Sequence, residues 1–212
     1  MSTTLGAEDA ERLRACVAGG GVAVFPSDTV YGVCCDPENE AAAKRLYQLK
    51  GRPATRPAAV MFFALEQALR ALPELLAAER AALQALLPGP VTLLLENRSG
   101  DFHAACRQDP ATLGLRVPWL PEELHALCSI EQPVMQTSAN LSGQPDARTL
   151  TEVPASLRDG ADMVLDGGTL PGTPSTVVDL REYEHSGAWY VLREGALAAE
   201  AVGELLTGAP AR

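Results

Sequence analysis

Lys50 and Arg52, two positions apart, are the side chains best suited to binding phosphate. A lysine supplies a mobile point charge, and an arginine supplies a planar fork that matches phosphate oxygens. The surrounding residues 41–65 carry five Lys or Arg and no Asp or Glu, although the whole chain has a net charge of −10. This basic segment favours a compact polyanion such as a triphosphate. Basic residues at the end of a helix also complement its dipole, so a structural role is the alternative.

Arg116 lies in an otherwise apolar run, residues 112–118. In a strand, side chains alternate between two faces, so Thr112, Gly114 and Arg116 share one face. An arginine on an inward face needs an anionic partner, because an unpaired buried charge is costly. That partner is either a carboxylate elsewhere in the core or the carboxylate of a substrate, and the sequence leaves both open.

Three short runs combine hydroxyl, amide and carboxylate side chains next to apolar stretches: residues 26–32 (PSDTVYG), 136–143 (QTSANLSG) and 174–179 (PSTVVD). Strand ends in α/β proteins are common ligand sites, so these runs could hold a small polar substrate. The same residue types also favour turns and helix caps. The sequence contains no Gly-x-Ser-x-Gly, His-Glu-x-x-His or Walker A pattern, which disfavours serine hydrolase, zinc protease and P-loop chemistry.

The acidic composition disfavours non-specific binding to DNA or long RNA, which depends on Lys and Arg neutralising phosphates. No apolar run reaches membrane-spanning length, and the N-terminal residues do not read as a secretory signal. The five cysteines form no Cys-x-x-Cys pair and are expected to be reduced thiols. We therefore expect a cytoplasmic protein that binds neither membrane nor DNA.

Apolar periodicity predicts the elements that must position these side chains. Helices are expected at 7–18, 37–50 (with Asp36 as N-cap), 65–71, 78–87, 121–129 and about 197–206. Strands are expected at 21–26, 58–63, 88–97, 112–118, 133–140, 162–168, 175–180 and 188–194. Loops are expected at 97–111, 142–150 and 167–174. The irregular alternation of strands and helices predicts one α/β domain over residues 1–212, with a mixed sheet covered by helices.

Seven motifs in order, PSDTVYG, LKGRP, LLPGPVT, TLGLRVP, QTSANLSG, STVVD and LREG, resemble the YrdC/TsaC family of threonylcarbamoyl-AMP synthases. The resemblance covers about residues 19–195. It implies a twisted α/β fold around one deep, positively lined cavity. It also implies that threonine, bicarbonate and ATP give threonylcarbamoyl-AMP and pyrophosphate for the threonylcarbamoyladenosine modification of tRNA. Mg²⁺ would sit on the phosphates without protein ligands, and a downstream transferase complex and tRNA are the implied partners.

The resemblance also assigns site residues. Lys50 and Arg52 are the implied catalytic residues, because they would neutralise the phosphates and the leaving pyrophosphate. The implied ATP contacts are Lys50, Arg52, Thr112, Ser138, Asn140 and Arg193. The implied threonine contacts are Thr29, Tyr31, Arg116 and Ser175. The chain departs from the family pattern at Ser27, Arg56, Met61 and the run before Ser138.

Two other functions remain open at this stage. One is an RNA-binding module of the YrdC/YciO type that uses a concave basic surface without catalysis; the acidic net charge weighs against it. The other is carbamoyl transfer to a different acceptor, as in the HypF-like domain, which would use carbamoyl phosphate and need no threonine.

Overall fold

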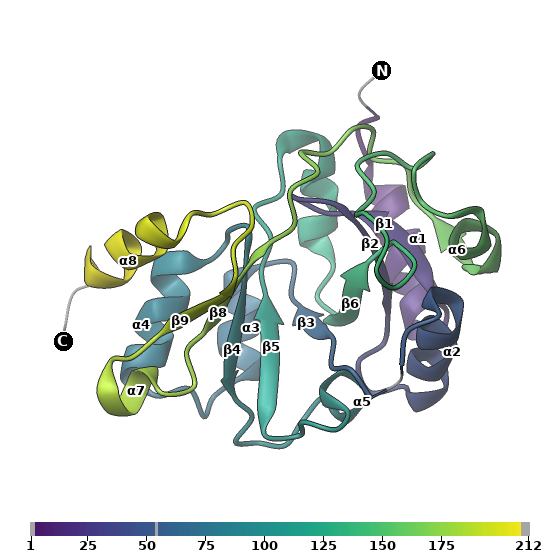
Figure 1. Ribbon diagram of the computed structural model, residues 1–212. Coiled ribbons are helices and arrows are strands. Elements are labelled where there is room, and N and C mark those ends of the chain that lie inside the picture. The colour runs from purple at the N-terminus through teal and green to yellow at the C-terminus, as the bar shows by residue number, and fades with distance from the viewer. Residues whose placement is uncertain (1–2, 54, 209–212) are drawn as a thin grey trace.

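Nine strands form a single mixed sheet in the computed structural model, which describes residues 3–53 and 55–208 (Figure 1). The strands are β1 (Ala23–Pro26), β2 (Tyr31–Cys35), β3 (Ala59–Met61), β4 (Val91–Glu96), β5 (Thr112–Arg116), β6 (Val134–Ser138), β7 (Met163–Val164), β8 (Thr176–Asp179) and β9 (Tyr190–Arg193). Their order across the sheet is β7-β1-β2-β6-β3-β5-β4-β8-β9. The pairs β1–β7, β3–β5 and β4–β8 are parallel, and the others are antiparallel. The predicted mixed α/β sheet is confirmed.

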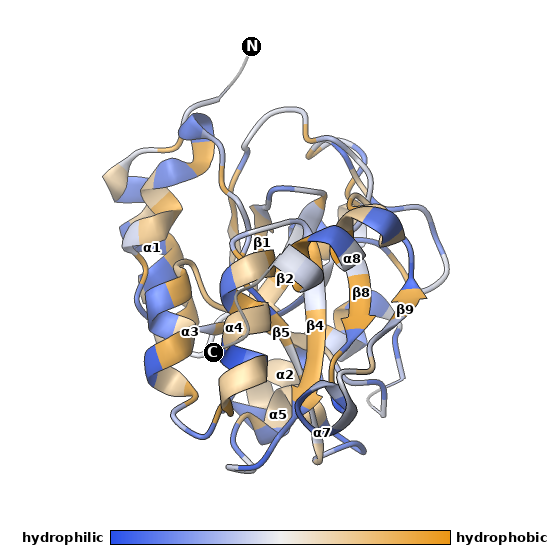
Figure 2. Cartoon of the chain, turned by 90° about the vertical axis from the view of Figure 1, so that its left-hand side faces the viewer, coloured by the Kyte–Doolittle hydropathy of each residue, from blue (hydrophilic) through white to orange (hydrophobic). Residues whose placement is uncertain are grey.

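Helices cover the sheet and bury their apolar sides against it (Figure 2). They are α1 (Ala7–Ala18), α2 (Glu40–Lys50), α3 (Leu65–Ala71), α4 (Ala77–Leu86), α5 (His103–Cys106), α6 (Ala155–Gly160), α7 (Tyr183–Ser186), α8 (Ala199–Gly208) and the 3₁₀ helix η1 (Glu122–Ser129). Helices α1, α2 and α6 lie toward the β1 side of the sheet, and α4 and α8 lie toward β9 (Figure 1). None of the described helices is long and apolar enough to cross a membrane.

Helix α2 brings the basic segment to the sheet. Its N-cap is Asn39, whose side chain accepts the Ala42 N–H at 3.0 Å. The predicted cap at Asp36 is therefore wrong: the Asp36 carboxylate instead accepts the Glu38 N–H at 2.9 Å in a local turn, the alternative that Asp offers its own backbone. The predicted end is confirmed, because Gly51 adopts a left-handed conformation with φ of 57°. This turn directs the chain, and Arg52 with it, back toward the sheet.

Several short elements differ from the expected ones. The hairpin after β1 leads directly into β2, which the sequence analysis did not predict, although Tyr31 and Val33 favour a strand. All five of its residues are buried, because β1 and β6 flank it on both sides. Helix α5 lies within the expected loop 97–111, and α8 extends two residues beyond its expected end. The expected loops 142–150 and 167–174 contain no helix or strand.

Candidate active site

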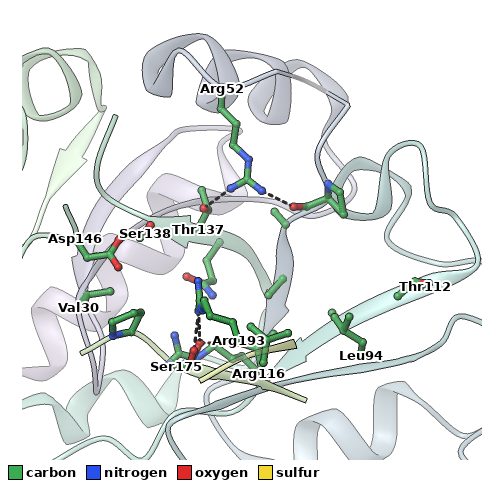
Figure 3. A pocket seen from close by; sticks show the side chains of 18 of the residues that line it. Val30, Arg52, Leu94, Thr112, Arg116, Thr137, Ser138, Asp146, Ser175 and Arg193 are labelled. Carbon is green, nitrogen blue, oxygen red and sulfur yellow. Dashed lines mark hydrogen bonds between the residues drawn. The ribbon is translucent and has the colours of Figure 1, made fainter. Parts of the chain in front are cut away.

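A pocket of about 300 Å³ lies where the middle of the sheet meets the loops that carry Val30, Arg52, Asp109, Asp146 and Pro174 (Figure 3). Its walls come from segments far apart in the sequence: Val30 of the β1–β2 hairpin, Arg52 after α2, residues of β4, β5 and β6, and Arg193 of β9. The lining residues are Val30, Arg52, Pro57, Ala58, Ala59, Thr92, Leu94, Asp109, Thr112, Gly114, Arg116, Gln136, Thr137, Ser138, Asp146, Pro174, Ser175, Val177 and Arg193. Three guanidinium groups and two carboxylates therefore face one cavity.

Arg52 forms one wall of the pocket (Figure 3). Its Nη1 donates to Thr137 Oγ1 at 2.8 Å, and its Nη2 donates to the Pro57 carbonyl at 2.8 Å. Its guanidinium carbon also lies 5.9 Å from the centre of the Tyr47 ring, within the range of a cation–π contact. None of these partners is charged, so the guanidinium is held in place while its positive charge remains available to a ligand.

Lys50 is buried behind this wall rather than on it. Its Nζ donates to the Ser138 carbonyl and, at 3.0 Å, to Asn140 Oδ1. The pKa of Lys50 is lowered to about 8, mainly by burial and also by the neighbouring Arg52, while Asp146 acts in the opposite direction. Lys50 thus joins the end of α2 to the turn after β6 and places a positive charge behind the pocket. A direct contact of its amine with a ligand would require those bonds to rearrange.

Ser138 and Asn140 lie in the turn where β6 ends. The Ser138 hydroxyl lines the pocket and donates to Asn140 Oδ1 at 2.8 Å. Asn140 does not line the pocket; its amide oxygen accepts from both Ser138 and Lys50. Lys50, Ser138 and Asn140 are therefore connected by hydrogen bonds, and Arg52 is attached to the adjacent Thr137. Of these four predicted residues, Arg52 and Ser138 face the cavity.

Arg116 is buried at the opposite side of the pocket from Arg52 (Figure 3). Its Nη2 donates to Asp28 Oδ1 and, at 3.1 Å, to Thr29 Oγ1. Its Nε is buried without a hydrogen-bond partner among the described residues. Of the two partners that the sequence left open, the carboxylate of the protein's own Asp28 is present. Thr112, Gly114 and Arg116 all line the pocket, which confirms the predicted shared face of β5.

Arg193 and Ser175 lie beside Arg116. Arg193 Nη2 donates to the Ser175 carbonyl at 2.7 Å, and the Ser175 and Thr92 hydroxyls are 2.8 Å apart. Gly195 allows this approach, because a Cβ at that position would lie only 2.2 Å from the Pro174 carbonyl oxygen. Arg193 is therefore attached to the start of β8, and both residues face the cavity.

Thr112 lies at the far end of the pocket from Ser138 (Figure 3). Its hydroxyl accepts a hydrogen bond from Arg181 Nη1 at 3.3 Å, and Arg181 is paired with Asp179. A second hollow, which shares Thr112 and Asp109 with the pocket, opens on this side.

Two predicted threonine contacts do not line the pocket. Thr29 lies behind Arg116 and accepts its hydrogen bond. Tyr31 is fully buried, and its hydroxyl is hydrogen-bonded to Asp166 Oδ1 at 3.0 Å, to the Gly168 carbonyl at 2.9 Å and to the Gly167 N–H at 2.9 Å. The sequence resemblance placed Tyr31 at the ligand, whereas its phenol faces the 166–168 segment on the other side of the hairpin.

The basic segment does not act as one unit. Arg45 lies on the outer surface and pairs with Asp162 at 2.6 Å, so a distant acidic residue neutralises it. Met61, at a position that departs from the family pattern, is fully buried in β3 and does not line the pocket. Only part of the segment thus contributes to the site, because the helix directs its charged residues to different sides.

Several polar residues of the site were not predicted from the sequence. Asp28 was noted only as part of a polar run, and its pairing with Arg116 carries no local signal. Gln136 shares a face of β6 with Ser138 and could have been found by the same strand alternation that selected Arg116. Thr137 could not, because consecutive side chains of a strand point to opposite faces. Thr92, Asp109 and Asp146 line the pocket from β4 and from two loops, and no residue pattern marks them.

Comparisons with known proteins place the chain among relatives of one family. The Sua5/YciO/YrdC family model, described as "Telomere recombination", matches residues 15–195. The threonylcarbamoyl-AMP synthase of Nitrosococcus oceani is 35% identical over 153 residues, which are 72% of this chain and 82% of that protein.

Solved structures share the overall fold. The structure of P. abyssi Sua5 complexed with L-threonine superposes with a TM-score of 0.82 at 27% identity, covering 97% of this chain and 59% of that one. The chain thus spans somewhat more than half of the P. abyssi protein. E. coli YciO superposes with a TM-score of 0.79 at 23% identity, covering 95% of this chain and 96% of that one, a likeness of fold.

Proposed function

The chain belongs to the Sua5/YciO/YrdC family, and on that basis we propose that it makes threonylcarbamoyl-AMP from L-threonine, bicarbonate and ATP. The observation that carries the proposal is one pocket that combines Arg52 and Ser138 on one side with Arg116 and Ser175 on the other. A triphosphate and an amino-acid carboxylate each need a positively charged, hydrogen-bonding site. A reaction that joins these two substrates requires both sites to face one cavity.

The reaction balances without a protein nucleophile. The threonine amine and bicarbonate form a carbamate and release water; a carbamate oxygen then attacks the α-phosphorus, and pyrophosphate leaves. The carbamate oxygen already carries negative charge, so the protein has to align the reactants and stabilise the charge on the phosphates. We assign this second task to Arg52 on the pocket wall and to Lys50 behind it.

At the other side, Arg116 would bind the threonine carboxylate, with Ser175 as a neighbouring hydroxyl and Thr29 orienting the guanidinium. Thr112 and Arg193 would contact ATP from β5 and β9. We propose an indirect role for Tyr31 and Asn140, because neither lines the pocket and both hold segments that do. A deep, water-excluding cavity would protect the product, a mixed anhydride that water hydrolyses.

Mg²⁺ would reach the site on the phosphates of ATP, where it supplies charge neutralisation. The described residues offer no group of three or more His, Cys, Asp or Glu side chains that could hold a metal ion. Asp109 and Asp146 are carboxylates on the pocket wall, and carboxylate oxygens are ligands of the type that Mg²⁺ prefers. They could accept hydrogen bonds from waters of a phosphate-bound ion.

The test is pyrophosphate release from ATP with threonine and bicarbonate supplied together and omitted in turn. We expect release only when both are present. Release that ignores threonine would refute the proposal, and activity with carbamoyl phosphate alone would favour carbamoyl transfer. RNA binding that weakens steeply with salt and does not respond to ATP would favour a binding module instead. We propose that the protein acts in the cytoplasm and that a separate transferase complex then transfers its product to tRNA.

A further inference from the structure

Asp28 connects the β1–β2 hairpin to the buried arginine of the pocket. Its Oδ1 accepts from Arg116 Nη2, and its Oδ2 accepts from the Trp119 backbone N–H at 3.2 Å. The side chains of the pair are only 5% and 4% exposed, for Asp28 and Arg116 respectively. Asp28 does not line the pocket itself, so it acts on a ligand through Arg116 and through its charge.

The charges at this side of the pocket cancel only in part. Burial lowers the pKa of Arg116, and the positive charge of Arg193 acts in the same direction, whereas Asp28 opposes it. With the carboxylate of Asp28 included, the local group carries one net positive charge. A ligand with a single carboxylate would bring it to neutrality, whereas a ligand with two negative charges would leave an excess negative charge in a partly desolvated site.

We propose that Asp28 is a specificity-determining residue: its charge matches this side of the pocket to an amino acid with one carboxylate and discriminates against acidic amino acids. The inference rests on the proposed function, because it takes Arg116 as the group that binds the substrate carboxylate. The competing explanation is that Asp28 only satisfies a buried guanidinium and has no effect on which ligand binds.

Asparagine and aspartate are the probes that separate these explanations, because they have nearly the same shape and differ by one negative charge. Each is added as a competitor of L-threonine in a binding assay with the full chain. We expect the wild type to bind L-asparagine more tightly than L-aspartate. In Asp28→Asn the ratio of the two affinities should shift toward aspartate by about tenfold, the effect of removing one charge within about 10 Å at an effective dielectric constant of about 20.

The ratio is informative even where the substitution disturbs the site. Misplacement of Arg116 weakens both competitors, whereas the loss of the Asp28 charge favours aspartate selectively. Asp28→Glu keeps the charge and moves the carboxylate, so it should retain the wild-type preference for asparagine. A purely structural role predicts instead that Asp28→Glu and Asp28→Asn are impaired alike and that neither changes the ratio.

Asp162→Asn is the matched control. Asp162 likewise pairs with an arginine, Arg45, at 2.6 Å and accepts a backbone N–H, from Val22 at 2.8 Å, but it lies outside the pocket. Its substitution should leave the ratio unchanged.

Three results would overturn the inference: a wild type that binds both competitors equally, an unchanged ratio in Asp28→Asn, or an equal shift in the control. If Asp28→Asn does not fold, the ratio is measured in Asp28→Ser, which also removes the charge and should shift the ratio toward aspartate in the same way. Failure of the wild type to bind threonine at all would instead refute the proposed function, and the inference with it.

Discussion

The two sides of the pocket hold their arginines in different ways. Arg52 is bound by a hydroxyl and a backbone carbonyl, and no carboxylate among the described residues pairs with it or with Lys50. Arg116 is bound by the carboxylate of Asp28. Neutral partners fix a cation and leave its full charge to a ligand, whereas a carboxylate partner cancels it.

This difference fits two ligands of different charge. A triphosphate carries several negative charges, so the side that receives it gains from cations that are not neutralised within the protein. A single carboxylate needs less, and an unpaired buried guanidinium would be costly whenever the site is empty. The location of the carboxylate partner, rather than the number of arginines, therefore distinguishes the two sides.

Arg116→Ala should give the largest effect. It leaves Asp28 as a buried carboxylate without its partner, so the free energy of unfolding should fall by about 3–5 kcal/mol. Chemical denaturation measures this loss. The double variant with Asp28→Asn should recover part of the stability, because the uncompensated charge is removed as well. If it recovers none, the two residues are not coupled, and the contrast between the sides is wrong.

Arg52→Ala should weaken ATP binding by about 10- to 100-fold, the range for losing a charge-assisted hydrogen bond. Stability should change little, because its partners are a hydroxyl at the pocket and an exposed carbonyl. Calorimetric titration with ATP and, separately, with threonine tests whether the loss is confined to one side. Arg45→Ala, which removes a surface arginine of the same segment, is the control. A similar loss of ATP affinity in both variants would mean that Arg52 has no specific role in binding ATP.

The pH dependence of ATP binding should distinguish Lys50 from the arginines. Burial lowers the pKa of Lys50 to about 8, so the amine is charged below this pH and becomes neutral above it. ATP affinity in the wild type should therefore decrease several-fold as the pH rises through about 8. In Lys50→Met the affinity should be lower at pH 7 and nearly flat over the same interval. An unchanged profile in the variant would mean that another group titrates.

Ser175→Ala should have the smallest effect. It removes one hydroxyl that is bonded to Thr92 and faces the pocket, so threonine affinity should fall about threefold to tenfold. ATP affinity should stay within about twofold if the two sides are separate. Ser129→Ala, whose hydroxyl bonds the Ala126 carbonyl away from the pocket, should change neither affinity. An equal loss of affinity for threonine and ATP in Ser175→Ala would mean that the two sides of the pocket do not bind separate ligands.

Local patterns were sufficient for some parts of the site. The left-handed glycine after α2 and the alternation in β5 depend on neighbouring residues, and both were predicted correctly. The start of α2 was misplaced because Asp36 and Asn39 both suit a cap, and only the hydrogen bonds of the folded chain decide between them. β2 was missed because it is short and fully buried, so it lacks the alternation of polar and apolar residues that marks a half-buried strand.

The sequence by itself determined the family, the α/β class, and which side chains could bind phosphate or a carboxylate, since these follow from residue types in an ordered set of motifs. The tertiary structure decided which charges remain free. Lys50 meets Ser138 across 88 positions, Arg116 meets Asp28 across 88, and Tyr31 meets Asp166 across 135. Such pairings depend on how the strands are ordered in the sheet, because a charged group is neutralised by whatever the fold places within a few ångströms of it.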